Sequence, residues 1–305
     1  MMKLVLAISF FMVFACDNVV KIDEEGLVET DGIQTFYRKI GSGPILVVVH
    51  GGPGLDHSYM LPHWEILSKK FTLIFYDQRG TGKTSSKVDS SLISMNQFVE
   101  DLEALRTGLN LSKINLIGHS WGGLLAMNYA LRYSENINKI ILANSIGPSY
   151  DDLNSFVYMR NESFTEEDVE IQKTIMAKSG FVTGDREVIT SLLQEIFKVY
   201  FDEPSNLQKL NLTISKNTAK NIFKINGLML KELVAYNIQN KLQNLKIPSL
   251  VIHGENDLIT LESSKKILQS LVNARLEIIK NCGHFPAIEQ PEQFSKIVST
   301  FLLHE

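Results

Sequence analysis

The stretch "INLIGHSWGGLLAMNYALRY" at residues 114–133 constrains the fold more than any other part of the chain. Its first residues are apolar or β-branched and predict a buried strand, and its second half predicts a helix. Between them lies a G-x-S-x-G turn, in which the strand and the helix meet so closely that side chains at Gly118 and Gly122 would clash. Ser120 is thereby forced into a strained conformation with its hydroxyl at the start of the helix. The turn therefore predicts that Ser120 is a nucleophile.

Short apolar runs alternate with helical patterns along most of the chain. The expected strands are residues 34–40, 45–50, 72–77, 114–119, 139–144, 249–254 and 275–280. The expected helices are residues 58–69, 95–109, 121–133, 263–272 and 291–303. An antiparallel strand and turn are expected just ahead of residue 34. Several runs are apolar on both faces, as strands between two layers of helices must be. This order predicts an α/β fold with a mostly parallel, eight-stranded sheet flanked by helices.

The alternation stops between about residues 148 and 243. The chain there is polar and rich in helical patterns, and the next strand follows in "LKIPSLVIHG". We therefore predict a first core segment at 16–148, a helical cap at 149–243 and a second core segment at 244–305.

A serine hydroxyl needs a general base, and the base needs a group that orients it. In folds with this serine turn, the acid and then the histidine follow the serine along the chain. Asp257 follows the strand at 249–254, and His284 follows the strand at 275–280. The carboxyl ends of parallel strands build the sites of open α/β sheets. We predict Asp257 as the acid and His284 as the base, with Glu255 as an alternative acid.

Other reactive side chains fit these roles less well. His119 adjoins the serine, but adjacent residues on a sharp turn point apart. His253 lies inside a predicted strand, and Cys282 has no evident second base nearby. None of the seven histidines shows H-x-x-x-H or similar ligand spacing, so no metal site is expected.

The loop "HGGPG" at residues 50–54 follows another predicted buried strand. Its glycines expose backbone N–H groups, and a tetrahedral intermediate needs two such donors for its oxyanion. We expect the donors to be the N–H groups of Gly52 and of Trp121, the residue after the serine.

The segment "YDQRGTGKTSS" at residues 76–86 ends like a phosphate-binding loop. Such a loop begins with glycine five residues before its second glycine, and Asp77 occupies that position here. A carboxylate there would repel phosphate. We therefore expect no nucleotide, and we expect Asp77 and Arg79 to hold neighbouring loops by hydrogen bonds.

The N-terminus and the overall charge restrict location and partners. The apolar run Leu4–Ala15 is shorter than a bilayer-spanning helix and predicts a signal peptide at residues 1–15. Cys16 at its end resembles the lipidated cysteine of bacterial lipoproteins, which predicts a lipid-anchored protein of the cell envelope; a plain cleaved signal, or an uncleaved anchor, is the alternative. The net charge of −4 offers no basic surface for nucleic acid.

Together, "HGGPG", "DQRGTGKTS", "GHSWGG", "GENDLIT" and "CGHFP" resemble the prolyl aminopeptidase (proline iminopeptidase) family of the α/β-hydrolase fold. The resemblance covers roughly residues 30–148 and 244–305. It implies the triad Ser120, Asp257 and His284, a helical cap over the site, and neither a metal nor an organic cofactor. In that family, cap carboxylates hold the free amino terminus of the peptide. We expect Glu195 and Glu232 to fill this role.

Three functions remain open from the sequence. The first is an aminopeptidase that releases N-terminal proline or another small residue from short peptides. The second, on the same core, is a carboxylesterase or another hydrolase of small esters or amides that carry no free amine. The third is a non-catalytic binding protein on a hydrolase scaffold.

Overall fold

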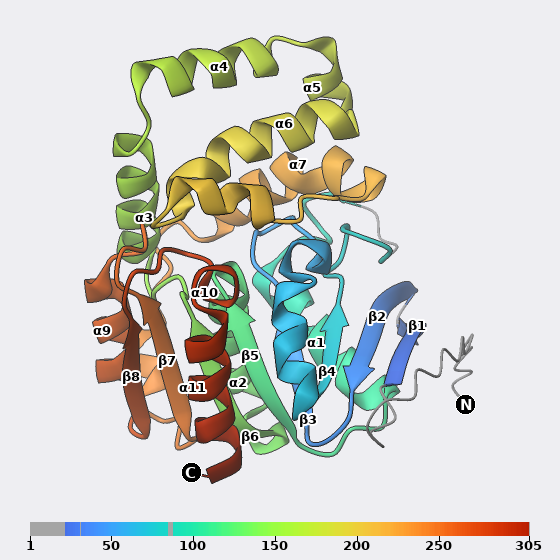
Figure 1. Cartoon of the computed structure of the whole chain (residues 1–305). Helices are drawn as coiled ribbons and strands as arrows, with labels where there is room; N and C mark the ends of the chain where they lie inside the picture. The colour runs from blue at the N-terminus through green and yellow to red at the C-terminus, as the bar shows by residue number, and fades with distance from the viewer. Residues whose placement is uncertain (1–21, 31, 85–87, 305) are drawn as a thin grey trace.

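The computed structural model describes residues 22–30, 32–84 and 88–304 of the chain. Its centre is one eight-stranded sheet with the strand order β1-β2-β4-β3-β5-β6-β7-β8 (Figure 1). Strand β2 pairs antiparallel with both of its neighbours, β1 and β4, and all other neighbouring strands pair in parallel. The predicted mostly parallel sheet is confirmed. Its strands are β1 Ile22–Thr30, β2 Ile33–Gly41, β3 Ile45–Val49, β4 Thr72–Tyr76, β5 Ile114–His119, β6 Ile137–Ala143, β7 Ser249–Gly254 and β8 Ala274–Ile279.

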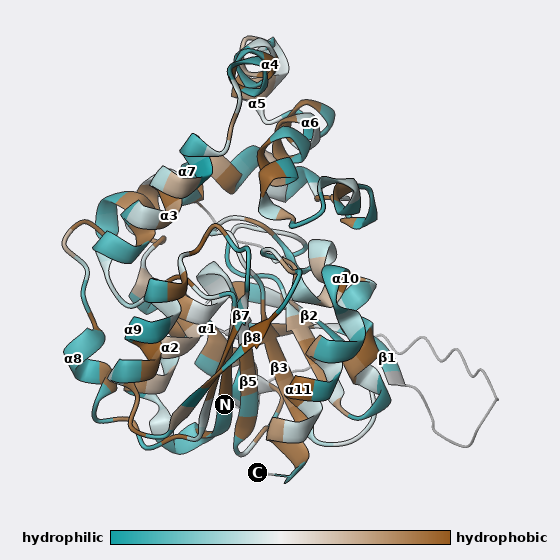
Figure 2. Cartoon of the chain, turned by 60° about the vertical axis from the view of Figure 1, so that its left-hand side comes forward, coloured by the Kyte–Doolittle hydropathy of each residue, from teal (hydrophilic) through white to brown (hydrophobic). Residues whose placement is uncertain are grey.

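Helices cover both faces of this sheet. One face is covered by α1 (Met95–Gly108), α2 (Trp121–Arg132) and α9 (Leu261–Ser270), and the other by α11 (Pro291–His304) and the 3-10 helix η2 (His63–Lys69) (Figure 2). The central strands are mostly hydrophobic in Figure 2, and every residue of β4 and β7 is buried. Strands that are buried on both faces do not alternate apolar and polar residues, which explains their mostly apolar sequences.

The structure differs from expectation at residues 58–69. The chain forms two short 3-10 helices there, η1 (His57–Met60) and η2, instead of one helix. Pro62 lies between them, and proline has neither the N–H nor the backbone freedom to continue a helix. The Asp56 side chain accepts a hydrogen bond from Ser58 N and so caps the first helix.

A set of helices is inserted between β6 and β7 and lies over the carboxyl ends of the central strands (Figure 1). The insertion leaves and rejoins the core at one place, because Ser149 and Asn237 form a β-bridge. Two backbone hydrogen bonds, Tyr150 N to Tyr236 O and Ile238 N to Pro148 O, close this junction. The inserted helices are α3 Tyr150–Glu162, α4 Glu166–Met176, α5 Ser179–Thr183, α6 Arg186–Phe197, η4 Lys198–Tyr200, η5 Pro204–Lys209 and α7 Lys216–Glu232.

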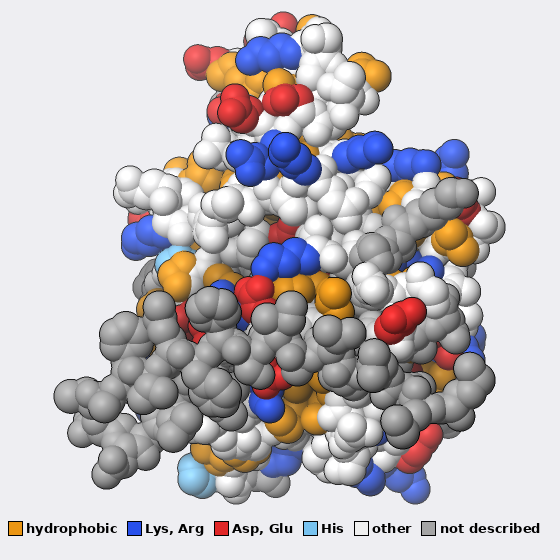
Figure 3. All heavy atoms as spheres, turned by 90° about the vertical axis from the view of Figure 1, so that its right-hand side faces the viewer, with side chains coloured by type: hydrophobic (Ala, Val, Ile, Leu, Met, Phe, Trp, Pro, Cys, Tyr) orange, Lys and Arg blue, Asp and Glu red, His pale blue; other side chains and the backbone are white. Residues whose placement is uncertain are grey.

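Helix α7 has one apolar side and one basic side. Ile222, Ile225 and Met229 recur every three or four residues and are buried toward the core. Lys216 and Lys220 are exposed on the opposite side. Figure 3 shows the molecule from the right-hand side of Figure 1. Lys and Arg side chains gather there on the upper half, over the inserted helices. Helix α7 therefore turns an apolar side inward and a basic side to solvent.

The remaining short elements are η3 Ser134–Asn136, α8 Gln239–Leu242 and α10 Pro286–Glu289. The predicted signal peptide at 1–15 and the lipidation site Cys16 lie outside the described residues. Within the residues that are described, no helix combines the length and apolarity needed to cross a bilayer. The same residues contain no cluster of three or more His, Cys, Asp or Glu side chains suited to a metal ion.

Candidate active site

Ser120 lies on the sharp turn between β5 and α2. Its backbone angles are φ 57° and ψ −122°, a conformation that non-glycine residues rarely adopt. A Cβ atom at Gly118 would collide with the carbonyl of Gly122, and one at Gly122 would collide with the carbonyl of Val49. The two glycines thus let helix and strand approach each other closely, and the strain at Ser120 follows from that approach.

Asp257 and His284 come together above the carboxyl ends of β7 and β8. The Asp257 Oδ1 and Oδ2 atoms lie 2.9 and 3.1 Å from His284 Nδ1. Ile259 N donates to Oδ1 over 3.0 Å, and Asn144 Nδ2 donates to Oδ2 over 2.7 Å. The Ile259 and Asn144 groups that contact the carboxylate are both donors. His284 Nδ1 also faces the carboxylate and therefore carries its proton there, as a third donor, which leaves Nε2 free to accept a proton.

The environment of Asp257 keeps it ionised. Burial alone would raise the pKa of this carboxyl, but its contacts with His284 and with the Ile259 N–H hold the pKa below its ordinary value. The acid therefore carries its charge across the neutral range. Glu255, the alternative acid, is exposed and accepts from Asn281 N instead.

Ser120 and His284 line the same cavity, which has a volume of about 220 Å³. The cavity lies between the sheet and the inserted helices. Its walls are mostly aliphatic and aromatic, and those from the cap include Leu153, Phe156, Leu193, Phe197, Ile222 and Met229. A small acyl group would be surrounded by apolar side chains next to the serine hydroxyl.

Gly52 and Trp121, the two predicted oxyanion donors, also line this cavity. Trp121 is the first residue of α2, so its N–H has no acceptor within the helix. Gly51 N donates to the Tyr59 hydroxyl over 2.7 Å and is therefore occupied. The Trp121 indole is held by a 3.0 Å hydrogen bond from Nε1 to Gln78 Oε1. The backbone around both predicted donors is therefore fixed by neighbouring contacts.

The other reactive side chains are unsuited to act as base or nucleophile. Burial, followed by the charge of nearby His284, lowers the pKa of His119 to about 3, so this ring stays neutral. It is also engaged on both sides, by the Tyr59 hydroxyl and the His284 carbonyl. Burial likewise lowers the pKa of His253 and raises that of the Cys282 thiol.

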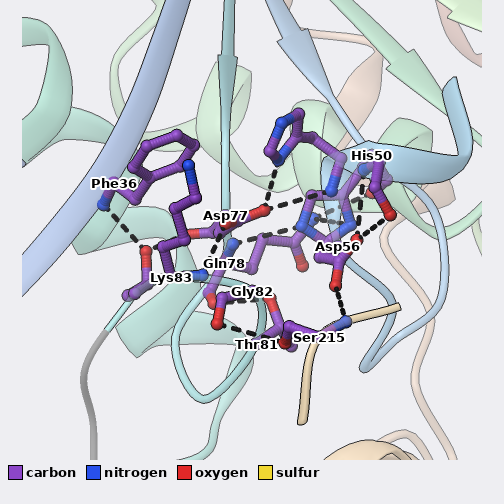
Figure 4. A network of polar contacts seen from close by, with 12 residues as sticks. Phe36, His50, Asp56, Asp77, Gln78, Thr81, Gly82, Lys83 and Ser215 are labelled. Carbon is purple, nitrogen blue, oxygen red and sulfur yellow. Dashed lines mark hydrogen bonds and ion pairs between the residues drawn. The ribbon is translucent and has the colours of Figure 1, made fainter. Parts of the chain in front are cut away.

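The segment that resembles a phosphate-binding loop is filled by the protein's own contacts (Figure 4). Asp77 accepts from His57 Nδ1 over 2.7 Å, from His57 N over 3.1 Å and from Lys83 N over 2.8 Å. Arg79 forms a buried ion pair with Asp101. Gly82 N donates to the Thr218 hydroxyl of α7 over 2.8 Å. The loop thus holds neighbouring segments together by hydrogen bonds, as expected, and also contacts the cap.

The two cap carboxylates expected to bind an amine lie elsewhere. Glu195 pairs with Lys198 over 3.0 Å, and Glu232 accepts from Met95 N over 3.0 and 3.1 Å, at the start of α1. Neither residue lines the cavity. A solvated ion pair and a helix-terminus contact, rather than substrate binding, account for these two acids, and the expectation is corrected accordingly.

Comparisons with known proteins show the family and the fold of the chain. The model of the α/β hydrolase fold family matches residues 44–291. The chain belongs to the α/β hydrolase fold family. This hydrolase is similar to the proline iminopeptidases of Heyndrickxia coagulans, at 26% identity over 91% of the chain and 98% of the relative, and of Lactobacillus helveticus, at 28% over 91% and 97%. The crystal structure of the Mycobacterium smegmatis proline iminopeptidase superposes with a TM-score of 0.67, at 19% identity, over 91% of this chain and 97% of that one.

Sequence reasoning missed several residues that shape the site of this α/β hydrolase. Asn144 donates both to Asp257 and, over 2.9 Å, to the Gly283 carbonyl. It directly follows β6, so the rule that found Asp257 and His284 at strand ends could have found it too. Arg160, in the last turn of α3, lines the cavity, and no motif marks it.

Proposed function

We propose that this chain hydrolyses a small acyl compound by way of an acyl-enzyme on Ser120. The observation that carries the proposal is the hydrogen bond between Asp257 and His284 at the cavity that Ser120 also lines. A strained serine, a histidine whose Nδ1 faces a carboxylate and a glycine loop are the parts that acyl transfer requires. The intact set argues against a non-catalytic binding protein.

In the proposed reaction, Ser120 Oγ attacks the substrate carbonyl while His284 Nε2 takes the hydroxyl proton. The N–H groups of Gly52 and Trp121 bind the oxyanion that forms. His284 then protonates the leaving group, and the bond to that group breaks. Water attacks the acyl-enzyme in the same way and restores the serine. Asp257 keeps His284 in the required tautomer and stabilises its positive charge.

The first candidate substrate is a short peptide with proline or another small residue at its N-terminus. The curated relatives named proline iminopeptidase, matched over nine-tenths of the chain, support this choice. The cavity of about 220 Å³ suits one small residue better than a polypeptide.

The second candidate is a small ester or amide without a free amine. The observation in its favour is that, of the residues that the structure describes, no Asp or Glu lines the cavity. A desolvated ammonium group needs a partner, because burying it alone is costly. An uncharged acyl group needs none.

A panel of matched substrates separates the two candidates. If the first holds, prolyl- and alanyl-arylamides are cleaved, and N-acetylation of the same compounds abolishes cleavage because it removes the amine. If the second holds, short acyl esters are cleaved and acetylation makes no difference. Release of the aryl group is followed by absorbance. Failure of every ester and amide, together with failure of a fluorophosphonate to react with Ser120, would exclude both candidates.

A further inference from the structure

The apolar cavity has a charged side chain in its wall, that of Arg160. Among the described residues that line it, Arg160 is the only Lys, Arg, Asp or Glu. It is partly buried and belongs to α3. Across the described part of the chain no carboxylate forms an ion pair with it. Its guanidinium contacts two neutral groups, Asn161 Oδ1 at 3.2 and 3.4 Å and the phenol of Tyr200. A cation at the wall of an apolar cavity is thus left without a counter-charge.

Arg160 lies on the side of the cavity where His284 stands. Tyr200 connects the two, since its ring centroid is 5.2 Å from that of His284, edge to face. Burial raises the pKa of the Tyr200 phenol, and the nearby Arg160 guanidinium opposes this rise. Phe156, one helical turn before Arg160, stacks at 6.2 Å from the His284 ring. The oxyanion donors come instead from the glycine loop and the start of α2.

This placement matters because His284 delivers its proton to the leaving group. A group held near Tyr200 and Arg160 is therefore part of the leaving group rather than of the acyl group. Guanidinium binds carboxylate in a two-pronged geometry that neutral side chains cannot match.

We infer that Arg160 binds a free carboxylate on the leaving group, so that the substrate is an acyl derivative of a small amino acid or hydroxy acid. The inference rests on the proposed acyl transfer. Ser120 Oγ bonds to the acyl carbon, the C–N or C–O bond breaks, and His284 protonates the departing nitrogen or oxygen. The carboxylate keeps its charge throughout. A dipeptide and an ester of a hydroxy acid share this chemistry.

Two pairs of compounds test the inference, each differing only in one charge. They are prolyl-glycine with prolyl-glycinamide, and butyryl-glycolate with butyryl-glycolamide. We expect the acid of the accepted pair to have a kcat/KM about 10- to 100-fold above that of its amide, the range typical of a hydrogen bond to a charged group. Most of the difference should lie in KM, because the carboxylate contact is the same in ground and transition states. The pair that is cleaved identifies the source of the carboxylate.

Variants connect this preference to one side chain. Arg160→Gln should lower the kcat/KM of the acid to that of its amide. Arg160→Lys should keep part of the preference for the acid. Arg186→Gln is the matched control, since it removes an exposed arginine of the cap that does not line the cavity. It should leave the ratio of acid to amide as it is in the unaltered chain.

Equal kcat/KM for acid and amide in the unaltered chain would overturn the inference, as would a preference that survives in Arg160→Gln. Cleavage of either compound would still support the acyl-transfer proposal. The experiment can therefore contradict the inference about Arg160 without contradicting acyl transfer. If none of the four compounds is cleaved, their binding to the Ser120→Ala variant is measured by calorimetry instead. The acid must then bind more tightly than the amide, and only when Arg160 is present; equal binding overturns the inference.

Discussion

Replacing Ser120 by alanine lowers turnover by about 10⁶-fold on the best substrate of the panel, the scale observed when a triad nucleophile is removed. The reason is that, within the described part of the chain, the other reactive side chains near the serine turn are unsuited to take the acyl group in place of Ser120. His119 stays neutral and is bonded on both sides, and the Cys282 thiol is buried with a raised pKa. The measurement is kcat under saturating substrate, with enzyme purified free of host hydrolases.

A matched serine separates chemistry from damage to the fold. Ser145 is also buried near the turn, and its hydroxyl donates to the Ile146 carbonyl over 2.9 Å without lining the cavity. Ser145→Ala should keep most of the activity. If Ser120→Ala and Ser145→Ala lost activity equally, or if Ser120→Ala retained near-normal rates, Ser120 would not be the nucleophile.

Replacing Asp257 by asparagine lowers kcat by about 10⁴-fold, as expected when the triad histidine adopts the wrong tautomer. Either orientation of the new amide points its NH2 group at a donor, because Ile259 N faces one oxygen position and Asn144 Nδ2 faces the other. An amide that donates to His284 Nδ1 moves the ring proton to Nε2. The histidine can then no longer accept the proton of Ser120.

Heteronuclear NMR of the imidazole nitrogens measures this tautomer directly. We expect the Nδ1-protonated form in the unaltered chain and the Nε2-protonated form in Asp257→Asn, measured at a temperature at which the variant is folded. An Asp257→Asn variant with kcat within about tenfold of the unaltered chain would show that Asp257 is not the orienting acid.

Much of the core could be predicted from the sequence because its signals are local. The strand β3 is a continuous apolar run, β5 and β7 are mostly apolar, and the glycines at 118 and 122 are needed for one specific close approach. Asp257 and His284 could be placed near each other because parallel strands end at one edge of a sheet. None of these inferences required knowledge of contacts between distant helices.

The sequence predicts the helical cap, but which of its side chains face the cavity could not be predicted in the same way. Whether an acid on a cap helix faces the cavity or solvent depends on how helices pack, and Glu195 and Glu232 turned out to serve an ion pair and a helix terminus. The same limit hid Arg160, whose importance comes only from the apolar walls around it. The division of residues 58–69 into two short helices follows from Pro62, a local signal that the helical pattern obscured.

The most direct test of the account is to treat the folded chain with a fluorophosphonate and locate the adduct by mass spectrometry. The reagent phosphonylates a serine only where a base activates it. We predict one adduct per chain, on Ser120, and none when His284 is replaced by alanine. An adduct on another residue, or labelling of Ser120 that persists without His284, would contradict the central claim that these side chains work as one unit.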